Sequence, residues 1–354
     1  MKKCYINGTG CVSAQKTLDA AFLEEVVINQ KDNILSLVQP DYKNYITPAA
    51  GRRMAKGVKN GIVASAKAMQ EAGTQNFDAI ITGTGMGCNV DSEKFLMALI
   101  DNKEEFLTPT SFIQSTHNTV GAQIALGLQC KAYNFTYVNG AVSFESALID
   151  AQMQIQEEDA QSVLVGGIEE VADNTIQFMQ FTGAIKDKDS APFRVLNSKS
   201  NGAVFSEGSI FFVLENTHKE TSYAELKDVF IYNILAENEV KIKLESFLAR
   251  NKLSISDIDA VVLGYNGDAQ FDTYYTTLAE TIFKNVPQVY YKHLSGEYNV
   301  ASAFGLWVAA HIIKLQHINP GLKVNTLERK KYKNILLYNQ YRGQDHSFTL
   351  ISQC

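Results

Sequence analysis

The sequence has 354 residues, of which 45% are hydrophobic and 20% are charged, the balance of a globular protein with a sizeable core. Lys and Arg total 32 against 38 Asp and Glu, so the formal net charge is −6, and only six of the 32 basic residues are arginines. This charge balance gives little electrostatic support for nucleic-acid binding. No apolar stretch reaches the roughly 18 residues that a membrane span requires.

The five cysteines are scattered and form no CxxC pair, which argues against a disulfide framework or a zinc site. The first eight residues, MKKCYING, lack the apolar run of a signal peptide. We therefore expect a cytoplasmic protein with reduced thiols. Nothing in the sequence calls for a metal ion or another cofactor.

In chain order, the first part of the sequence predicts alternating strands and helices. Strands are expected over 4–12, 78–82, 134–138, 162–167 and 203–214, and helices over 51–73, 92–100, 119–128 and from 141 onward. Residues 108–114 are expected to form a loop. A glycine-rich loop, Gly83–Gly87, follows the second strand, but it lacks the Lys-Ser/Thr ending of a phosphate-binding loop, so close backbone packing is the favoured interpretation.

The second part repeats this alternation. Strands are expected over 229–234, 260–264 and 288–291, helices over 237–252, 273–283 and 300–315, and a pair of strands at the end. Both parts contain buried strands, which predicts a layered α/β architecture with two similar halves, 1–220 and 221–354, forming one intertwined unit.

The segment Asn134–Ala151 is the most informative stretch. A β-rich run turns sharply at Asn139-Gly140 and continues as a helix. Such a turn is expected to present its apex residue to solvent at the positive end of the helix dipole, where a thiolate or alkoxide is stabilised. The apex residue is Ala141, which has no nucleophilic atom.

Several short motifs occur in a fixed order along the chain. They are Tyr5–Ser13, Arg52-Arg53-Met54, Gly83–Gly87, Thr116–Ala125, Pro192-Phe193-Arg194 and Ser206-Glu207-Gly208. In order and spacing they resemble the β-ketoacyl synthase family of the thiolase fold over essentially the whole chain. The resemblance implies two pseudo-symmetric β/α halves in an α-β-α-β-α layered arrangement.

In that family a cysteine on the turn takes an acyl chain from a carrier-protein thioester, and two histidines stabilise the enolate formed when a malonyl thioester loses CO2. This chain departs from the pattern at each position. The cysteine position is Ala141, the histidine of the His-Gly-Thr loop is Asn266, and the second histidine is Glu297. The family's lysine is retained as Lys292, and the terminal glycine-rich loop, with its gating phenylalanine, is degenerate over 339–345.

Each replacement has a chemical consequence. Ala141 abolishes the acyl-enzyme, whereas Asn266 retains the ability to donate a hydrogen bond. An ionised Glu297 places negative charge where the enolate's charge must develop. We expect Glu297 to pair with Lys292, with Glu207 as a possible third member, in a structural network that fills the old site.

Other candidate residues have simpler interpretations. Ser143 is a conceivable substitute nucleophile, but a serine at a helix N-terminus is typically a capping residue. His293 is the one histidine beside the site, and a partly buried structural histidine is favoured. Asp268 and Asp272 with Glu297 suggest a metal site only weakly, because no histidine cluster accompanies them and loop carboxylates are usually solvated.

The first functional hypothesis is a non-catalytic subunit resembling the chain-length factors of type II polyketide and aryl-polyene-type pathways. It would pair, through the strand at 134–138, with a cysteine-bearing ketosynthase on which the acidic acyl carrier protein docks. The expected interface and tunnel residues are Thr110, Ser111, Phe112, Ile113, Gln114, Phe135 and Tyr137. Two alternatives remain: a residual decarboxylase or acyltransferase that uses Asn266 as oxyanion donor, and a homodimeric acyl-binding protein.

Overall fold

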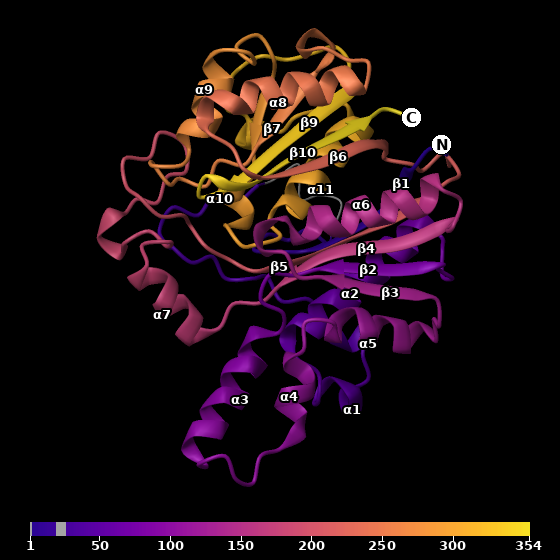
Figure 1. Ribbon diagram of the computed structural model, residues 1–354, viewed down its shortest axis with the longest axis vertical. Helices are drawn as coiled ribbons and strands as arrows, with labels where there is room; N and C mark the ends of the chain where they lie inside the picture. Colours follow the sequence, from indigo (N-terminus) through magenta and orange to yellow (C-terminus); the bar gives the residue numbers. More distant parts are fainter. Residues whose placement is uncertain (1, 19–25) are drawn as a thin grey trace.

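The computed structural model describes residues 2–18 and 26–354. In these ranges ten strands form one sheet in the order β3-β2-β4-β5-β1-β6-β10-β9-β7-β8 (Figure 1). The strands are β1 (Tyr5–Val12), β2 (Ala79–Gly83), β3 (Tyr133–Tyr137), β4 (Ser162–Glu169), β5 (Gly208–Glu215), β6 (Ala224–Ile234), β7 (Ala260–Leu263), β8 (Gln288–Tyr290), β9 (Asn334–Tyr341) and β10 (Gln344–Ser352).

Eleven α-helices of the described residues accompany the sheet. They are α1 (Pro48–Gly51), α2 (Lys56–Ala72), α3 (Asn89–Asp101), α4 (Pro109–Ser115), α5 (Thr119–Leu128), α6 (Ser143–Gln156), α7 (Asp173–Phe181), α8 (Glu237–Arg250), α9 (Thr273–Glu280), α10 (Lys292–Ser295) and α11 (Ser302–Leu315). None of the helices in the described ranges has the length and apolar content needed to cross a bilayer.

The strand pairing divides the sheet into two matching halves. In the first, β3, β2 and β4 are parallel, and β5 and β1 follow in antiparallel pairs. In the second, β8, β7 and β9 are parallel, and β10 and β6 follow in antiparallel pairs. The halves meet where Tyr5 and Ile6 of β1 pair with Glu225 and Ala224 of β6. This confirms the predicted pseudo-symmetric α/β architecture, and the proposed division after residue 220 falls between β5 and β6.

Two helices lie between the halves and form the middle layer. Helix α6 contacts β2 and β4 of the first half and β6 of the second, and α11 contacts β9 and β10 as well as β1 and β5. Their apolar side chains, including Phe144, Leu148 and Phe304, share one buried cluster with strands of both halves. Helix α2 covers the outer face of the first half, and α8 and α9 cover that of the second. Three apolar clusters, one between the halves and one beneath the outer helices of each half, thus produce the α-β-α-β-α layering.

Three elements differ from the sequence-based expectations. The helix expected from Gly51 is interrupted, because α1 ends there and Ala55 is extended, with its N–H donating to Gln114 Oε1 at 3.1 Å. The loop expected at 108–114 is helix α4, which begins with Pro109, a position where the missing N–H costs nothing. Helix α7 has no counterpart among the expected elements.

One substructure projects from the layers. Helix α3, the turn after it and α4 extend away from the sheet on the side of α5 and β3 (Figure 1). We call residues 89–115 the arm. Its turn has positive φ at Lys103, Glu104 and Phe106, which bends the chain sharply between the two helices.

Candidate functional site

The predicted turn before α6 is present, but its apex is closed. After β3, one 3-10 turn over Gly140–Val142 leads into α6, and Gly140 has φ +53°. Ala141 is only 3% exposed, so the expectation that the apex faces solvent is wrong. The reason is that the carboxylate of Asp345 lies over it, with the Ala141 N–H donating to Asp345 Oδ2 at 3.4 Å.

Asp345 belongs to the degenerate loop that follows β9. It is half-buried at the start of β10, and burial raises the pKa of its carboxyl while the hydrogen bond from Ala141 lowers it. An anion of the chain itself therefore occupies the backbone N–H before α6, where the helix dipole would favour a bound anion. A developing oxyanion at this N–H would meet a carboxylate already in place.

Three of the predicted site residues form one buried network. Glu297 Oε2 accepts hydrogen bonds from Lys292 Nζ and from Asn266 Nδ2, each at 2.7 Å, and Oε1 accepts one from the Tyr298 N–H at 3.2 Å. Asn266, Lys292 and Glu297 are 3%, 1% and 2% exposed. The donors of Asn266 and Lys292 thus point at a carboxylate of the chain rather than into open space.

Glu207 does not take part in this network in the structure. It pairs with Lys56 at the start of α2 and accepts a hydrogen bond from the Val171 N–H at 3.4 Å. The cation that pairs with Glu207 is therefore Lys56 of the outer helix α2, 151 residues earlier in the chain, and not the expected Lys292 of the second half.

The loop that carries Asn266 is held by a buried carboxylate. Asp272 accepts hydrogen bonds from the N–H groups of Asn266 at 3.1 Å and Gly267 at 2.9 Å, and burial raises its pKa to about 7. Asp268 is also buried, so the expectation that these loop carboxylates are solvated is wrong. Within the described ranges, no group of three or more His, Cys, Asp or Glu side chains could hold a metal ion.

Glu145 of α6 is a buried residue near the site that the sequence did not reveal. Its Oε1 accepts a hydrogen bond from Ser347 Oγ at 2.7 Å, whereas Oε2 has no partner among the described residues. Burial raises the pKa of Glu145, and the charge of Lys292 lowers it. In the sequence Glu145 is an ordinary acidic residue in the first turn of a helix, so no local signal marks it as buried.

Ser143 and His293 are engaged elsewhere. Ser143 Oγ donates to Gly140 O at 2.7 Å and accepts from the Asn139 N–H at 2.8 Å, so it stabilises the turn. His293 Nε2 donates to Gly321 O at 2.8 Å, and burial lowers the pKa of its imidazole to about 3. A neutral, hydrogen-bonded imidazole that points toward Gly321 has no contact through which to act on Glu297.

Two further carboxyl groups lie at the end of β4, beside the glycine-rich loop. Glu169 accepts hydrogen bonds from the N–H groups of Gly85 at 2.9 Å and Met86 at 2.8 Å, so the chain itself uses the donors that a phosphate would need. Neither oxygen of Glu170 has a hydrogen-bond partner among the described residues. Burial raises the pKa of Glu169 to about 7, and burial together with the charge of Glu207 raises the pKa of Glu170 to about 7.

The predicted interface residues divide into exposed and buried groups. Thr110, Phe112 and Ile113 are exposed on α4, and Ser111 is half-buried. Gln114 is buried and bonds to Ala55, so its side chain is not available at a surface. Phe135 is 46% exposed on β3, the last strand of the sheet, between the rings of Tyr133 and the half-buried Tyr137.

If the Lys292–Glu297 pair is structural, removing one partner should be far more harmful than removing both charges. We expect Lys292→Met to lower the free energy of unfolding by about 3–5 kcal/mol, because Glu297 is left buried without its cation. The double variant Lys292→Met/Glu297→Gln should lie within about 1 kcal/mol of the wild type, since no uncompensated charge remains. Urea unfolding measures both; equal losses in the two variants would contradict a structural pair.

The raised pKa of Glu170 predicts a pH dependence of stability. The folded state binds a proton at this carboxyl more tightly than the unfolded state, so its contribution is largest below the ordinary glutamate pKa and is lost as the pH rises through about 7. We expect Glu170→Gln to stabilise the protein by about 1–3 kcal/mol at pH 8 and to have little effect at pH 4.5.

Glu169→Gln is the matched control for this prediction. Removing its charge should also help at pH 8, because its pKa is raised to about 7, but the amide can accept only one of the two backbone hydrogen bonds that Glu169 accepts. We therefore expect the gain at pH 8 to be about 1–2 kcal/mol smaller than that of Glu170→Gln. Thermal unfolding at pH 4.5, 6 and 8 measures both variants. If Glu170→Gln gave no larger gain than Glu169→Gln at pH 8, Glu170 would have a hydrogen-bond partner that the structure does not show.

The chain was compared with known proteins. The model of the N-terminal domain of β-ketoacyl synthases matches residues 39–220, a range that contains Ala141 and Glu207. No match to a curated protein was found. A β-ketoacyl synthase from Burkholderia phymatum is similar in structure over all of both chains, with 17% identical residues and a TM-score of 0.79.

Two further solved structures are similar over nearly all of their own chains. The ishigamide ketosynthase/chain length factor matches all of this chain and 99% of its own, with 14% identity and a TM-score of 0.80. The ketosynthase ApeO in complex with its chain length factor ApeC, from Xenorhabdus doucetiae, matches all of this chain and 98% of its own, with 13% identity and a TM-score of 0.75. These likenesses establish the thiolase-like fold, and the domain match, which spans just over half of the chain, shows that the protein belongs to the β-ketoacyl synthase family.

Proposed function

We propose that this chain is a non-catalytic β-ketoacyl synthase homologue that acts as a chain-length-factor-like subunit. It pairs with a cysteine-bearing ketosynthase that carries out chain elongation of the fatty-acid or polyketide type. One observation carries the proposal: the turn before α6 holds Ala141, and its N–H is covered by the chain's own Asp345 carboxylate. Neither the nucleophile nor a free oxyanion donor is available there.

The network around Glu297 supports the same conclusion. Enolate formation needs hydrogen-bond donors aimed at a developing negative charge. In this chain Lys292 and Asn266 donate to Glu297, a carboxylate with the wrong sign of charge for that task. All three side chains are excluded from solvent, which leaves no room for a thioester between them.

The surface of the first half supports a partner. Strand β3 is hydrogen-bonded to β2 on one side, and its other side is the edge of the sheet. Tyr133 and Phe135 on this strand are exposed, as are Phe112 and Ile113 on α4. An exposed apolar edge strand is normally paired or covered. Two of the similar solved structures are of a ketosynthase with a chain length factor, which favours the same kind of pairing here.

The net charge of the chain and its free cysteines indicate where the carrier protein binds and in which compartment the pair works. The net charge of −6 disfavours direct docking of an acidic carrier protein, so we assign carrier binding to the partner subunit. All five cysteines are free, and three of them are buried, which suits a reducing cytoplasm.

The alternative of a residual decarboxylase or acyltransferase has less support. It depends on Asn266 as an oxyanion donor, and the amide nitrogen of Asn266 already donates to Glu297 at 2.7 Å. A homodimeric acyl-binding protein would use the same exposed β3 edge, so oligomeric state separates it from the heterodimer. A stable homodimer with no ketosynthase bound would favour that alternative.

The pairing surface is tested by a charge placed on the β3 edge. Phe135→Asp should abolish co-purification of the ketosynthase with the tagged chain from its native host, because a buried carboxylate would face the partner. Ile242→Asp, which alters an exposed apolar residue of α8 in the outer layer of the other half, is the matched control and should leave binding intact. Size-exclusion chromatography with light scattering gives the stoichiometry; equal binding by both variants would rule out the β3 interface.

A further inference from the structure

The arm carries an apolar surface that the rest of the described chain leaves open. Phe106, in the turn, is 93% exposed, and Ile100, near the end of α3, is 70% exposed. Leu96 and Met97 on α3 are about half exposed. Large apolar side chains gathered on one projecting substructure are typical of a protein–protein contact.

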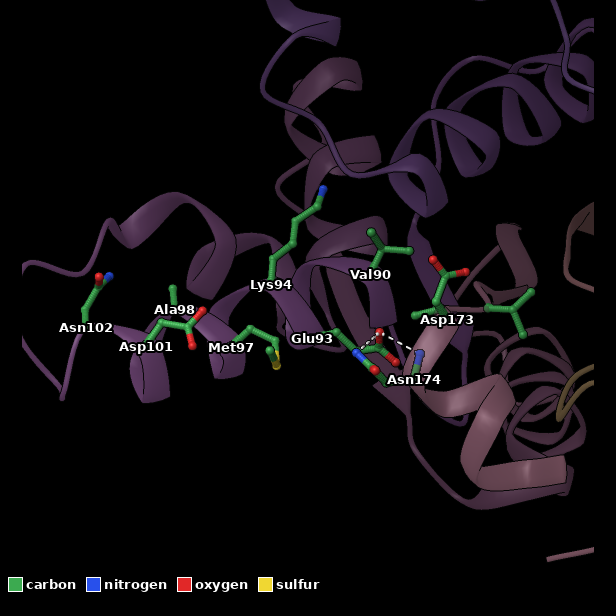
Figure 2. A pocket seen from close by; sticks show the side chains of 11 residues that line it. Val90, Glu93, Lys94, Met97, Ala98, Asp101, Asn102, Asp173 and Asn174 are labelled. Carbon is green, nitrogen blue, oxygen red and sulfur yellow. Dashed lines mark hydrogen bonds between the residues drawn. The ribbon is translucent and has the colours of Figure 1, made fainter. Parts of the chain in front are cut away.

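The arm is also fixed in position, which a docking surface requires. Glu93 of α3 accepts hydrogen bonds from the N–H and side-chain amide of Asn174, each at 3.1 Å, and from the N–H and hydroxyl of Thr175 at 2.7 and 2.8 Å (Figure 2). Although burial alone would raise it, these hydrogen bonds hold the pKa of Glu93 below its usual value. The carboxylate thus caps α7 and ties the arm to it, so little order has to be gained on binding.

A cleft of about 590 Å³ lies between α3 and the start of α7 (Figure 2). Its lining combines apolar groups with acidic ones. The apolar side chains are Val90, Met97, Ala98, Val171 and Ala172, the carboxylates are Glu93, Asp101 and Asp173, and Lys94 is the one basic residue of the lining.

The charge of this region identifies the kind of occupant. Residues 89–106 together with Asp173 contain six carboxylates and two lysines, a formal charge of −4 out of −6 for the whole chain. An acidic carrier protein would be repelled there, whereas a basic surface would be attracted.

The arm is continuous with the proposed pairing surface. Helix α3 contacts α4, α4 contacts α5, and α5 contacts β3 (Figure 1). Exposed apolar residues occur on every one of these elements, including Leu126 of α5. A partner seated on the β3 edge would therefore meet a continuous row of elements with exposed apolar side chains that leads to the arm.

We propose that the arm is a docking surface for a basic segment of the ketosynthase partner. A lysine or arginine of that segment enters the cleft that Asp101 and Asp173 line, and Phe106 is buried against apolar residues beside it. This inference rests on the proposed function and extends its interface from β3 and α4 onto α3 and the turn.

The test measures the dissociation constant for the purified ketosynthase subunit that co-purifies with the wild-type chain. Asp101→Lys/Asp173→Lys should weaken binding about tenfold or more in 50 mM NaCl and only about twofold in 500 mM NaCl, because salt screens exposed charges. Phe106→Ser should weaken binding about tenfold at both salt concentrations, because its contribution is apolar. Both aspartates and Phe106 are exposed, so the variants should fold, which circular dichroism verifies.

The matched control is Asp159→Lys/Glu220→Lys, which makes the same change in charge at exposed positions away from the arm. It should bind the ketosynthase like the wild type. If both arm variants bind normally while Phe135→Asp does not, the arm proposal is overturned and the proposed function stands. If no ketosynthase binds the wild-type chain, both proposals fail. If the arm variants instead weaken binding of the acyl carrier protein, the assigned occupant is wrong.

Discussion

One buried carboxylate determines how the rest of the site is arranged. Glu297 is held by Lys292 and Asn266 in the interior between the two halves of the fold, where an unpaired charge would be costly. Because Lys292 and Asn266 both donate to Glu297, their donor groups belong to an internal network. The three side chains bind one another and form a buried, charge-compensated centre.

On two other loops, backbone N–H groups that could bind an external anion donate instead to a carboxylate of the chain. The Ala141 N–H donates to Asp345, and the N–H groups of Gly85 and Met86 donate to Glu169. Backbone donors at turns and helix starts are natural binding sites for anions. In this chain they are satisfied by its own carboxylates, while the three apolar clusters that define the layers do not depend on them.

The sequence predicts the fold well, because the layers depend on local patterns. Alternating buried strands and helices predict the layers, and short motifs place Ala141, Asn266 and Glu297. The helix α4 is missed because four of its seven residues are Pro, Thr or Ser, a composition that resembles a loop. The roles of Asp345, Glu145 and Glu170 cannot be predicted, since an acidic residue in a sequence is normally solvated and only the tertiary structure buries it. For the same reason the pairing of Glu207 with Lys56 has no sequence signal.

The most direct test of the account is where an acyl group becomes attached in the purified pair. The complex is incubated with an acyl thioester of the carrier protein, and intact-mass spectrometry reads each subunit, with malonyl decarboxylation measured for this chain alone. We predict one acyl group on the partner's cysteine subunit, none on this chain, and no decarboxylation without the partner. An acyl adduct on this chain, or release of CO2 by it alone, would contradict a non-catalytic role.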